Sequence, residues 1–222
     1  MGRWIELQPE GAGAIAAWRA DPAGAPRGGI VVIQEIFGVN AHIRAVTDRF
    51  ADEGYLAVAP AIFDRIEPGF DVGYDPDSRA RGTAVVAKVD VEQVLRDAAA
   101  AIAVAREGGK VGIVGYCFGG NIAWAAAARL PGLSAAVGYY GGRVLAMRDL
   151  QPKAPTILHF GEEDAHIPIV EVRAFAAARP DVPVYTYPAD HGFNCDHRAS
   201  YDAPSAALAW ERTLAFFGAQ LA

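Results

Sequence analysis

The stretch GYCFGG at 115–120 follows the apolar run KVGIV at 110–114 and precedes the alanine-rich segment NIAWAAAARL at 121–130. An apolar run, a glycine-flanked residue and a helix-forming segment in this order are typical of a nucleophile elbow, the tight turn between a strand and a helix that exposes one reactive side chain. Glycines are expected at 115 and 119 because such a turn leaves no room for a Cβ atom on either side. The pattern predicts that Cys117 points away from the sheet, with its sulfur near the N-terminus of the following helix, where the helix dipole favours a thiolate.

The sequence around this elbow alternates apolar runs with segments of helical period, which predicts an α/β fold with a mostly parallel central sheet and helices on both faces. Residues 1–20 fit an antiparallel hairpin, and residues 60–89, which have no strong period, predict an excursion of the chain over the edge or the mouth of the sheet. The predicted strands are 29–34, 55–59, 110–114, 133–140, 155–160 and 182–187. The predicted helices lie around 43–51, 90–106, 118–130, 168–178 and 203–217.

Composition and charge narrow the possible functions. The chain has 222 residues, 52% of them hydrophobic, which is enough to bury one large core in a single domain spanning residues 1–222. Its formal net charge of -6 and the lack of a Lys/Arg-rich run argue against nucleic-acid binding. No apolar segment has the length of a secretory signal or a membrane span. We therefore expect a cytoplasmic monomer that acts on small molecules and does not bind membranes.

The partners of a catalytic cysteine are expected later in the chain, an acid first and then a histidine. The segment GEEDAHIP at 161–168 contains Glu162, Glu163 and Asp164, and PADHGFNCDHR at 188–198 contains His191 and His197. Asp164 and His191 are favoured because Asp164 directly precedes the next helix and Gly192 allows a sharp turn after His191. In this interpretation His191 takes the proton of Cys117 and Asp164 orients the imidazole.

Two alternatives accompany that interpretation. Cys117 could be a small buried hydrophobic residue in a glycine-rich turn. The grouping of His191, Cys195 and His197 could also ligate a metal, but no second cluster completes a tetrahedral set, so neither a metal nor any other cofactor is predicted. Cys117 and Cys195 lack C-x-x-C spacing, and no disulfide framework is expected.

These residues resemble the dienelactone hydrolase family, the carboxymethylenebutenolidases, a branch of the α/β-hydrolase fold that uses cysteine as its nucleophile. The resemblance covers residues 30–217. It implies hydrolysis of a lactone or ester by Cys117, Asp164 and His191 through a thioacyl-enzyme, without a cofactor. The motifs that carry it are QEIFGVN at 34–40, GYCFGG at 115–120, VGYYG at 137–141, GEED at 161–164 and HGF at 191–193.

The resemblance also implies roles for the residues at the end of the first long strand. Glu35 is expected beside the thiol, where an arginine holds it in the resting enzyme and where it helps to deprotonate the cysteine when substrate arrives. The backbone N–H groups of Ile36 and Phe118 are expected to bind the oxyanion. The alternative for Glu35 is a structural carboxylate that ties its own loop together.

Substrate recognition is where the sequence departs from the family pattern. The family binds the substrate carboxylate with two arginines, one before the long helix, which here could be Arg79 or Arg81. The other stands four residues after the histidine, where this chain has Cys195, and Arg198 is the nearest substitute. Tyr140 could add a hydroxyl to the site. The remaining candidates are a carboxylesterase or thioesterase without an arginine clamp, and a redox-responsive protein that pairs Cys117 with Cys195.

Overall fold

The computed structural model describes residues 2–222, in which eight strands form one sheet in the order β1-β2-β4-β3-β5-β6-β7-β8. β1 and β2 are antiparallel to their neighbours, and all other pairs are parallel. This confirms the mostly parallel sheet and the hairpin at the N-terminus. The strands are β1 (Arg3–Leu7), β2 (Ile15–Ala20), β3 (Gly29–Ile33), β4 (Leu56–Pro60), β5 (Val111–Tyr116), β6 (Leu133–Tyr139), β7 (Thr156–Gly161) and β8 (Val184–Tyr187).

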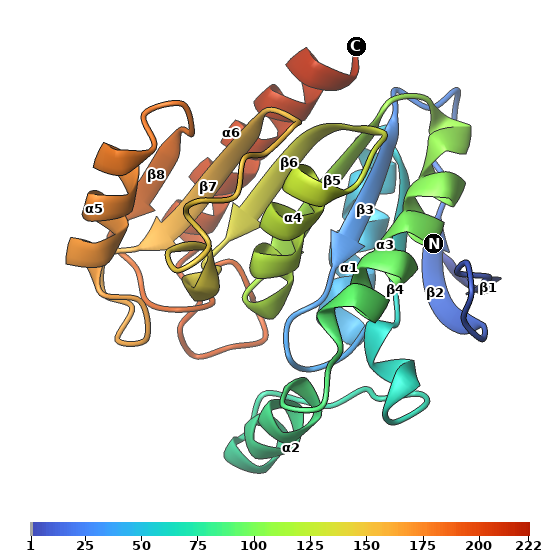
Figure 1. Cartoon of the computed structure of the whole chain (residues 1–222), viewed down its shortest axis with the longest axis horizontal. Helices are drawn as coiled ribbons and strands as arrows, with labels where there is room; N and C mark the ends of the chain where they lie inside the picture. The colour runs from blue at the N-terminus through green and yellow to red at the C-terminus, as the bar shows by residue number, and fades with distance from the viewer. Residues whose placement is uncertain (1) are drawn as a thin grey trace.

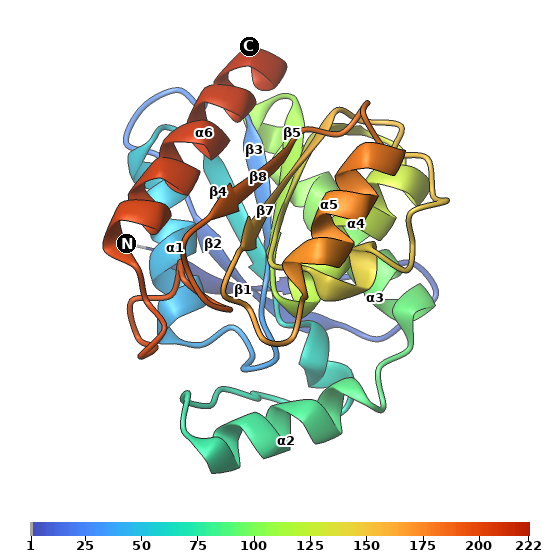
Figure 2. The same cartoon turned by 90° about the vertical axis from the view of Figure 1, so that its left-hand side faces the viewer.

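Helices cover both faces of the sheet, as predicted (Figures 1 and 2). α1 (Ala41–Asp52) and α6 (Ala203–Leu221) lie on one face. The other face carries α3 (Val91–Ala105), α4 (Phe118–Arg129) and α5 (Ile169–Ala178). The last helix continues to Leu221, four residues beyond its predicted end. Short 3-10 helices occupy Ile62–Arg65, Arg106–Gly108 and Gly142–Val144.

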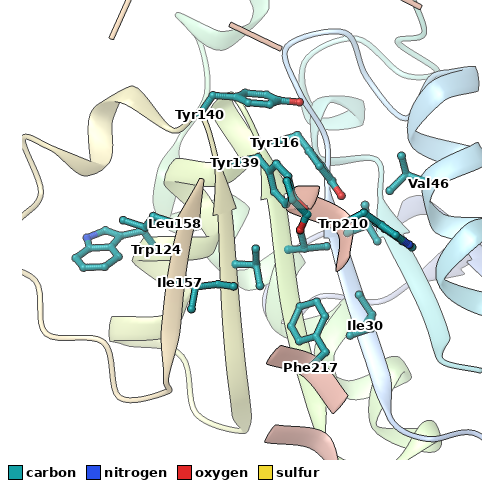
Figure 3. Close-up of a cluster of buried hydrophobic side chains, with 14 of the residues drawn as sticks. Ile30, Val46, Tyr116, Trp124, Tyr139, Tyr140, Ile157, Leu158, Trp210 and Phe217 are labelled. Atoms are coloured by element: carbon teal, nitrogen blue, oxygen red, sulfur yellow. The ribbon is translucent and has the colours of Figure 1, made fainter. Parts of the chain in front are cut away.

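The sheet is buried between two apolar layers, and this explains why its inner strands are almost purely apolar. Every residue of β3, β4 and β5 is buried, as expected for parallel strands covered on both faces. On the α1 and α6 face the ring of Phe50 packs 4.6 Å from Trp210 and 6.1 Å from Phe217. Figure 3 shows Trp210 and Phe217 beside the strand side chains of this core.

The segment 60–89 corrects one prediction, because it contains a helix as well as loops. α2 (Pro76–Val86) begins with proline at its N-terminus, and the Asp75 side chain accepts a hydrogen bond from the Ser78 N–H at 2.9 Å. The helix lies beyond the carboxyl ends of the parallel strands (Figures 1 and 2), which is the mouth and not the edge of the sheet. Only Gly82 and Val85 of α2 are buried, which explains why no apolar period marks it.

Within residues 2–222, every helix is too short or too polar to cross a lipid bilayer.

Candidate active site

The turn between β5 and α4 is built as the sequence predicts. Cys117 has φ 55° and ψ −114°, a backbone conformation that non-glycine residues rarely adopt. A Cβ atom at Gly115 would lie 1.9 Å from the Gly119 carbonyl oxygen, and one at Gly119 would lie 2.3 Å from the Ile33 carbonyl oxygen. Both glycines are therefore required by close backbone packing, and the turn leaves the Cys117 side chain partly exposed.

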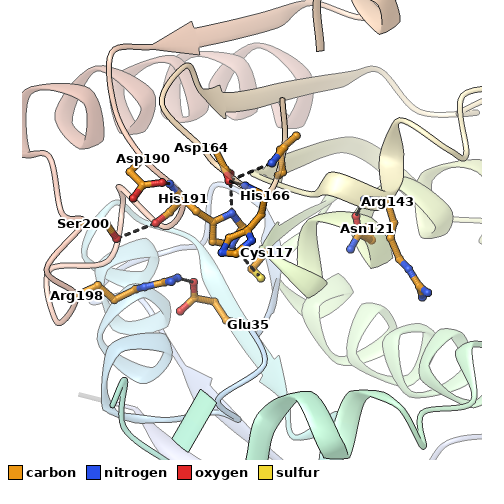
Figure 4. A network of polar contacts seen from close by, with 11 residues as sticks. Glu35, Cys117, Asn121, Arg143, Asp164, His166, Asp190, His191, Arg198 and Ser200 are labelled. Carbon is orange, nitrogen blue, oxygen red and sulfur yellow. Dashed lines mark hydrogen bonds and ion pairs between the residues drawn. The ribbon is translucent and has the colours of Figure 1, made fainter. Parts of the chain in front are cut away.

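His191 connects Cys117 to Asp164 (Figure 4). Its Nε2 atom lies 3.3 Å from the Cys117 Sγ atom, and its Nδ1 atom lies 2.6 Å from the Asp164 Oδ2 atom. The other carboxylate oxygen of Asp164 accepts hydrogen bonds from the backbone N–H groups of His166 at 2.8 Å and Ile167 at 3.2 Å. The structure thus places the three residues chosen from the sequence in one chain of hydrogen bonds.

The other acidic and histidine candidates lie outside this chain of hydrogen bonds. Glu162 and Glu163 are exposed, and the Glu162 carboxylate accepts a hydrogen bond from the Thr186 hydroxyl at 2.6 Å. The His197 side chain is 46% exposed and lines the cavity described below.

The electrostatic environment of His191 and Asp164 favours a protonated His191 imidazole. Burial alone lowers the pKa of His191, but hydrogen bonds to Asp164 and Cys117 and the charges of both groups outweigh it and raise this pKa to about 10. Burial likewise raises the pKa of Asp164, but the hydrogen bond and charge of His191 and the His166 N–H outweigh it and hold this pKa below its usual value. The site therefore stabilises an imidazolium between a carboxylate and a sulfur.

The two backbone N–H groups expected to bind an oxyanion are those of Phe118 and Ile36. Phe118 is the first residue of α4, so its N–H has no intrahelical acceptor. Ile36 follows the end of β3, against which Gly119 packs. Within residues 2–222 neither amide donates to another backbone group in a turn, loop or cap. Both N–H groups are therefore available to a ligand.

Glu35 forms an ion pair beneath the cavity. It is fully buried, and its Oε1 atom accepts a hydrogen bond from Nη1 of Arg198 at 3.2 Å (Figure 4). Burial lowers the pKa of Arg198, but the charge of Glu35 and of nearby groups raises it overall. A Cβ atom at Gly192, which has φ 77°, would lie 2.3 Å from Nη1 of Arg198. Glycine at 192 therefore suits both the positive φ of this turn and the close approach of the Arg198 guanidinium.

A polar cavity of about 620 Å³ opens over His191 and Arg198. Of the predicted substrate-binding residues it is lined by Arg79 and Arg198, whereas Arg81 turns to the surface, where its Nη2 atom lies 2.7 Å from Oε1 of Glu67. Tyr140 is fully buried and packs against the imidazole, with ring centroids 5.1 Å apart. Arg79 and Arg198 thus lie at the cavity, and Arg81 and Tyr140 do not line it.

Two further cavity residues were not singled out from the sequence. Tyr74 lines the cavity and accepts a hydrogen bond from Asn40 Nδ2 at 3.0 Å. His166 packs edge-on against His191, with ring centroids 5.8 Å apart. The position of His166 two residues after Asp164 was an available signal, whereas Tyr74 lies in a segment without any pattern.

Cys195 is placed differently from the accessible thiol that a redox pair with Cys117 requires. It is fully buried. Burial and the charge of Glu35 raise the pKa of its thiol to about 12. Since thiol–disulfide exchange proceeds through an accessible thiolate, this environment does not favour a redox pair.

Comparisons with known proteins agree with this arrangement. The model of the dienelactone hydrolase family matches residues 15–221. The carboxymethylenebutenolidase of Pseudomonas putida is 37% identical, with 96% of this chain and 94% of that protein covered. A protein of Synechocystis sp., provisionally given the same name, is 38% identical, with coverage of 93% and 92%. A crystal structure from Klebsiella pneumoniae, provisionally assigned as a dienelactone hydrolase, has a TM-score of 0.84 at 36% identity over 98% of both chains. A family match over nearly the whole chain and relatives of this coverage show that the chain belongs to the dienelactone hydrolase family and has its α/β-hydrolase fold.

Proposed function

We propose that this chain hydrolyses a small lactone or ester with Cys117 as nucleophile, His191 as general base and acid, and Asp164 as the residue that orients His191. The observation that carries the proposal is the position of the imidazole, with one nitrogen 3.3 Å from the Cys117 sulfur and the other 2.6 Å from Asp164. Nucleophile, base and orienting acid in this order are the components of acyl transfer.

The reaction proceeds in two stages. His191 takes the thiol proton, the Cys117 sulfur attacks the carbonyl carbon, and the N–H groups of Ile36 and Phe118 stabilise the oxyanion. Collapse breaks the carbon–oxygen bond to the leaving group, which receives the proton from His191, and a thioester remains on Cys117. His191 then takes a proton from water, whose oxygen attacks the thioester; the acid is released and the thiol is restored.

Glu35 and Arg198 prepare the nucleophile. In the resting site Arg198 holds the Glu35 carboxylate at 3.2 Å and also lines the cavity. A substrate carboxylate that pairs with Arg198 weakens its hold on Glu35, and the freed carboxylate can then assist the transfer of the Cys117 proton to His191. This role needs a substrate with its own negative charge, so it links nucleophile formation to substrate binding.

The preferred substrate class is an enol-lactone that carries a carboxylate, as in dienelactone. Arg79 and Arg198 supply positive charge to the cavity, and the relatives named carboxymethylenebutenolidase support this choice. A thiolate is itself a good leaving group, so the tetrahedral intermediate returns to substrate unless the departing oxygen is stabilised. An enolate meets this requirement, whereas a simple alkoxide does not.

The test is the loss of ultraviolet absorbance of cis- and trans-dienelactone with wild type and with Cys117→Ala, beside a panel of aryl esters. We expect dienelactone turnover by wild type and a kcat at least about 10³-fold lower for Cys117→Ala. Circular dichroism and urea unfolding of the variant establish that it is folded. Turnover of aryl esters alone would assign another substrate, and an unchanged rate in folded Cys117→Ala would refute the nucleophile.

A further inference from the structure

A second cluster of metal-binding side chain types lies outside the proposed reaction. It joins α1 to the loop that follows His191 and consists of His42, Cys195 and Asp196. A ring nitrogen, a sulfur and a carboxylate oxygen from these residues all lie within 4.8 Å of one another. The hydrolysis described above uses none of the three.

The His42 imidazole is buried, and one of its two nitrogen atoms has no hydrogen-bond partner within residues 2–222. Its side chain is 4% exposed, and its Nδ1 atom lies 3.0 Å from Oδ1 of Asp196. Its Nε2 atom is buried and has no hydrogen-bond partner within residues 2–222. A buried polar atom without a partner costs free energy, so it calls for a specific explanation. The imidazole thus has one nitrogen beside the Asp196 carboxylate and the other without a partner.

The chemistry of the three ligand atoms selects the class of cation. Imidazole, thiolate and carboxylate together suit Zn²⁺ and the similar ion Co²⁺, whereas Mg²⁺ and Ca²⁺ prefer oxygen ligands alone. Tetrahedral bonds of about 2.0–2.3 Å place ligand atoms roughly 3.5 Å apart, so a separation of up to 4.8 Å closes with small side-chain movements.

The surroundings offer both an entry path and a favourable charge. Asp196 is 62% exposed and, with His42, lines a surface pocket of about 170 Å³ next to α6. The buried charge of Glu35 acts on both His42 and Cys195. A cation can therefore reach Asp196 from solvent and gains from the Asp196 carboxylate, whereas Arg198 offsets part of the Glu35 charge.

We propose that His42, Cys195 and Asp196 form a site for a zinc-like divalent cation beside the hydrolase site, with water as the fourth ligand. Binding breaks the S–H bond of Cys195, and the proton leaves to solvent as the sulfur–metal bond forms. The site differs from the grouping of His191, Cys195 and His197 considered from the sequence, since only Cys195 is shared. Its histidine ligand is His42 in α1, which lies 154 residues before Asp196 in the chain.

The test uses Co²⁺ alone with the full-length Cys117→Ala protein. Removing Cys117 is essential because Cys117 and His191 form a separate thiol and imidazole pair, and Cys195 is then the only thiol. We expect one equivalent of Co²⁺ to give a thiolate-to-cobalt charge-transfer band. The band should disappear in Cys117→Ala/Cys195→Ser, and the affinity should fall about tenfold or more in Cys117→Ala/His42→Gln and Cys117→Ala/Asp196→Asn.

Thermal unfolding with Zn²⁺ provides an independent measurement. Zn²⁺ at about 100 times its dissociation constant should raise the Tm of Cys117→Ala by roughly 5–10 °C and leave that of Cys117→Ala/Asp196→Asn nearly unchanged. Asp196 is exposed, so this variant keeps the test valid if substitutions of the buried residues disturb folding. Absence of the band in folded Cys117→Ala at saturating Co²⁺, or a band that persists without Cys195, would overturn the proposal.

Discussion

Nη1 of Arg198 lies 3.2 Å from Oε1 of Glu35, and this ion pair joins the loop after His191 to the end of β3. The Glu35 side chain is fully buried, so bulk water does not stabilise its charge, whereas the Arg198 side chain is 11% exposed. The second carboxylate oxygen of Glu35 has no partner within residues 2–222. The stability of this part of the fold therefore depends on Arg198 remaining in place.

We expect Arg198→Met to lower the free energy of unfolding by about 3–5 kcal/mol, because it leaves the Glu35 charge buried and unpaired. Glu35→Gln should cost less, because Arg198 has partial access to solvent. The double variant should recover much of the loss, since both charges are then gone. Urea unfolding of the four proteins measures these differences. Strictly additive effects would contradict a pair that is energetically coupled.

The two arginines of α2 give a matched pair for substrate recognition. Arg79 lines the cavity, whereas Arg81 pairs with Glu67 on the surface. We expect Arg79→Met to raise KM for dienelactone about tenfold or more and to leave KM for a neutral aryl ester nearly unchanged, because only the first substrate has a carboxylate to lose its partner. Arg81→Met should leave KM for both substrates unchanged. Steady-state kinetics with both substrates measure these KM values. An equal change in KM for dienelactone in the two variants would exclude a specific role for Arg79.

α2 also supports the loop that carries the Ile36 amide. A Cβ atom at Gly82 would lie 2.2 Å from the Ile36 carbonyl oxygen, so the helix backbone packs directly on this loop. In an exposed helix Gly→Ala stabilises by about 1 kcal/mol. At position 82 we expect the reverse, a loss of stability together with a lower kcat, because α2 and the loop must move apart.

The control for Gly82→Ala is Ala84→Gly, an exposed position of the same helix. It should cost up to about 1 kcal/mol by helix propensity and leave kcat unchanged. Urea unfolding and kcat measured together separate the two effects. A stabilised Gly82→Ala with full activity would show that the loop tolerates the displacement.

The nucleophile and its partners could be predicted from the sequence because their positions follow from topology. In a parallel sheet the carboxyl ends of β5, β7 and β8 meet at one edge, so side chains that follow these strands come together. The order of cysteine, acid and histidine along the chain then identifies Cys117, Asp164 and His191. Local glycine patterns supplied the turns, and the positions of Gly115 and Gly119 against neighbouring carbonyl groups confirm that reasoning.

Other parts of the site depend on contacts that leave no periodic signal. α2 buries a glycine and one valine, so neither amphipathicity nor composition distinguishes it from a loop. Arg198 reaches Glu35 because the chain folds back over Gly192, and spacing along the sequence does not determine that path. His42 meets Cys195 through the packing of α1 against a loop near the C-terminus, a long-range contact that no local pattern encodes.

The raised pKa of His191 predicts how stability varies with pH. This pKa is about 10 in the folded protein, against an ordinary value of 6.5, so the folded chain binds more protons between these values. The stabilisation from the imidazolium is complete below about pH 6.5 and is lost as the pH rises towards about 10. Asp164, whose pKa is lowered, contributes in the opposite direction: its stabilisation is present above about pH 3.8 and is lost at lower pH.

We therefore expect the difference in unfolding free energy between wild type and His191→Gln to shrink from about pH 6 to about pH 9, as measured by urea unfolding at several pH values. Cys117→Ala tests whether Cys117 helps to raise the pKa of His191, because this variant removes the hydrogen bond and the charge that Cys117 contributes. The loss should then be smaller and should be complete at a lower pH, because the pKa of folded His191 falls while the ordinary value that sets the onset stays the same. Parallel stability profiles for wild type and His191→Gln would show that His191 is not held as an imidazolium by its two partners.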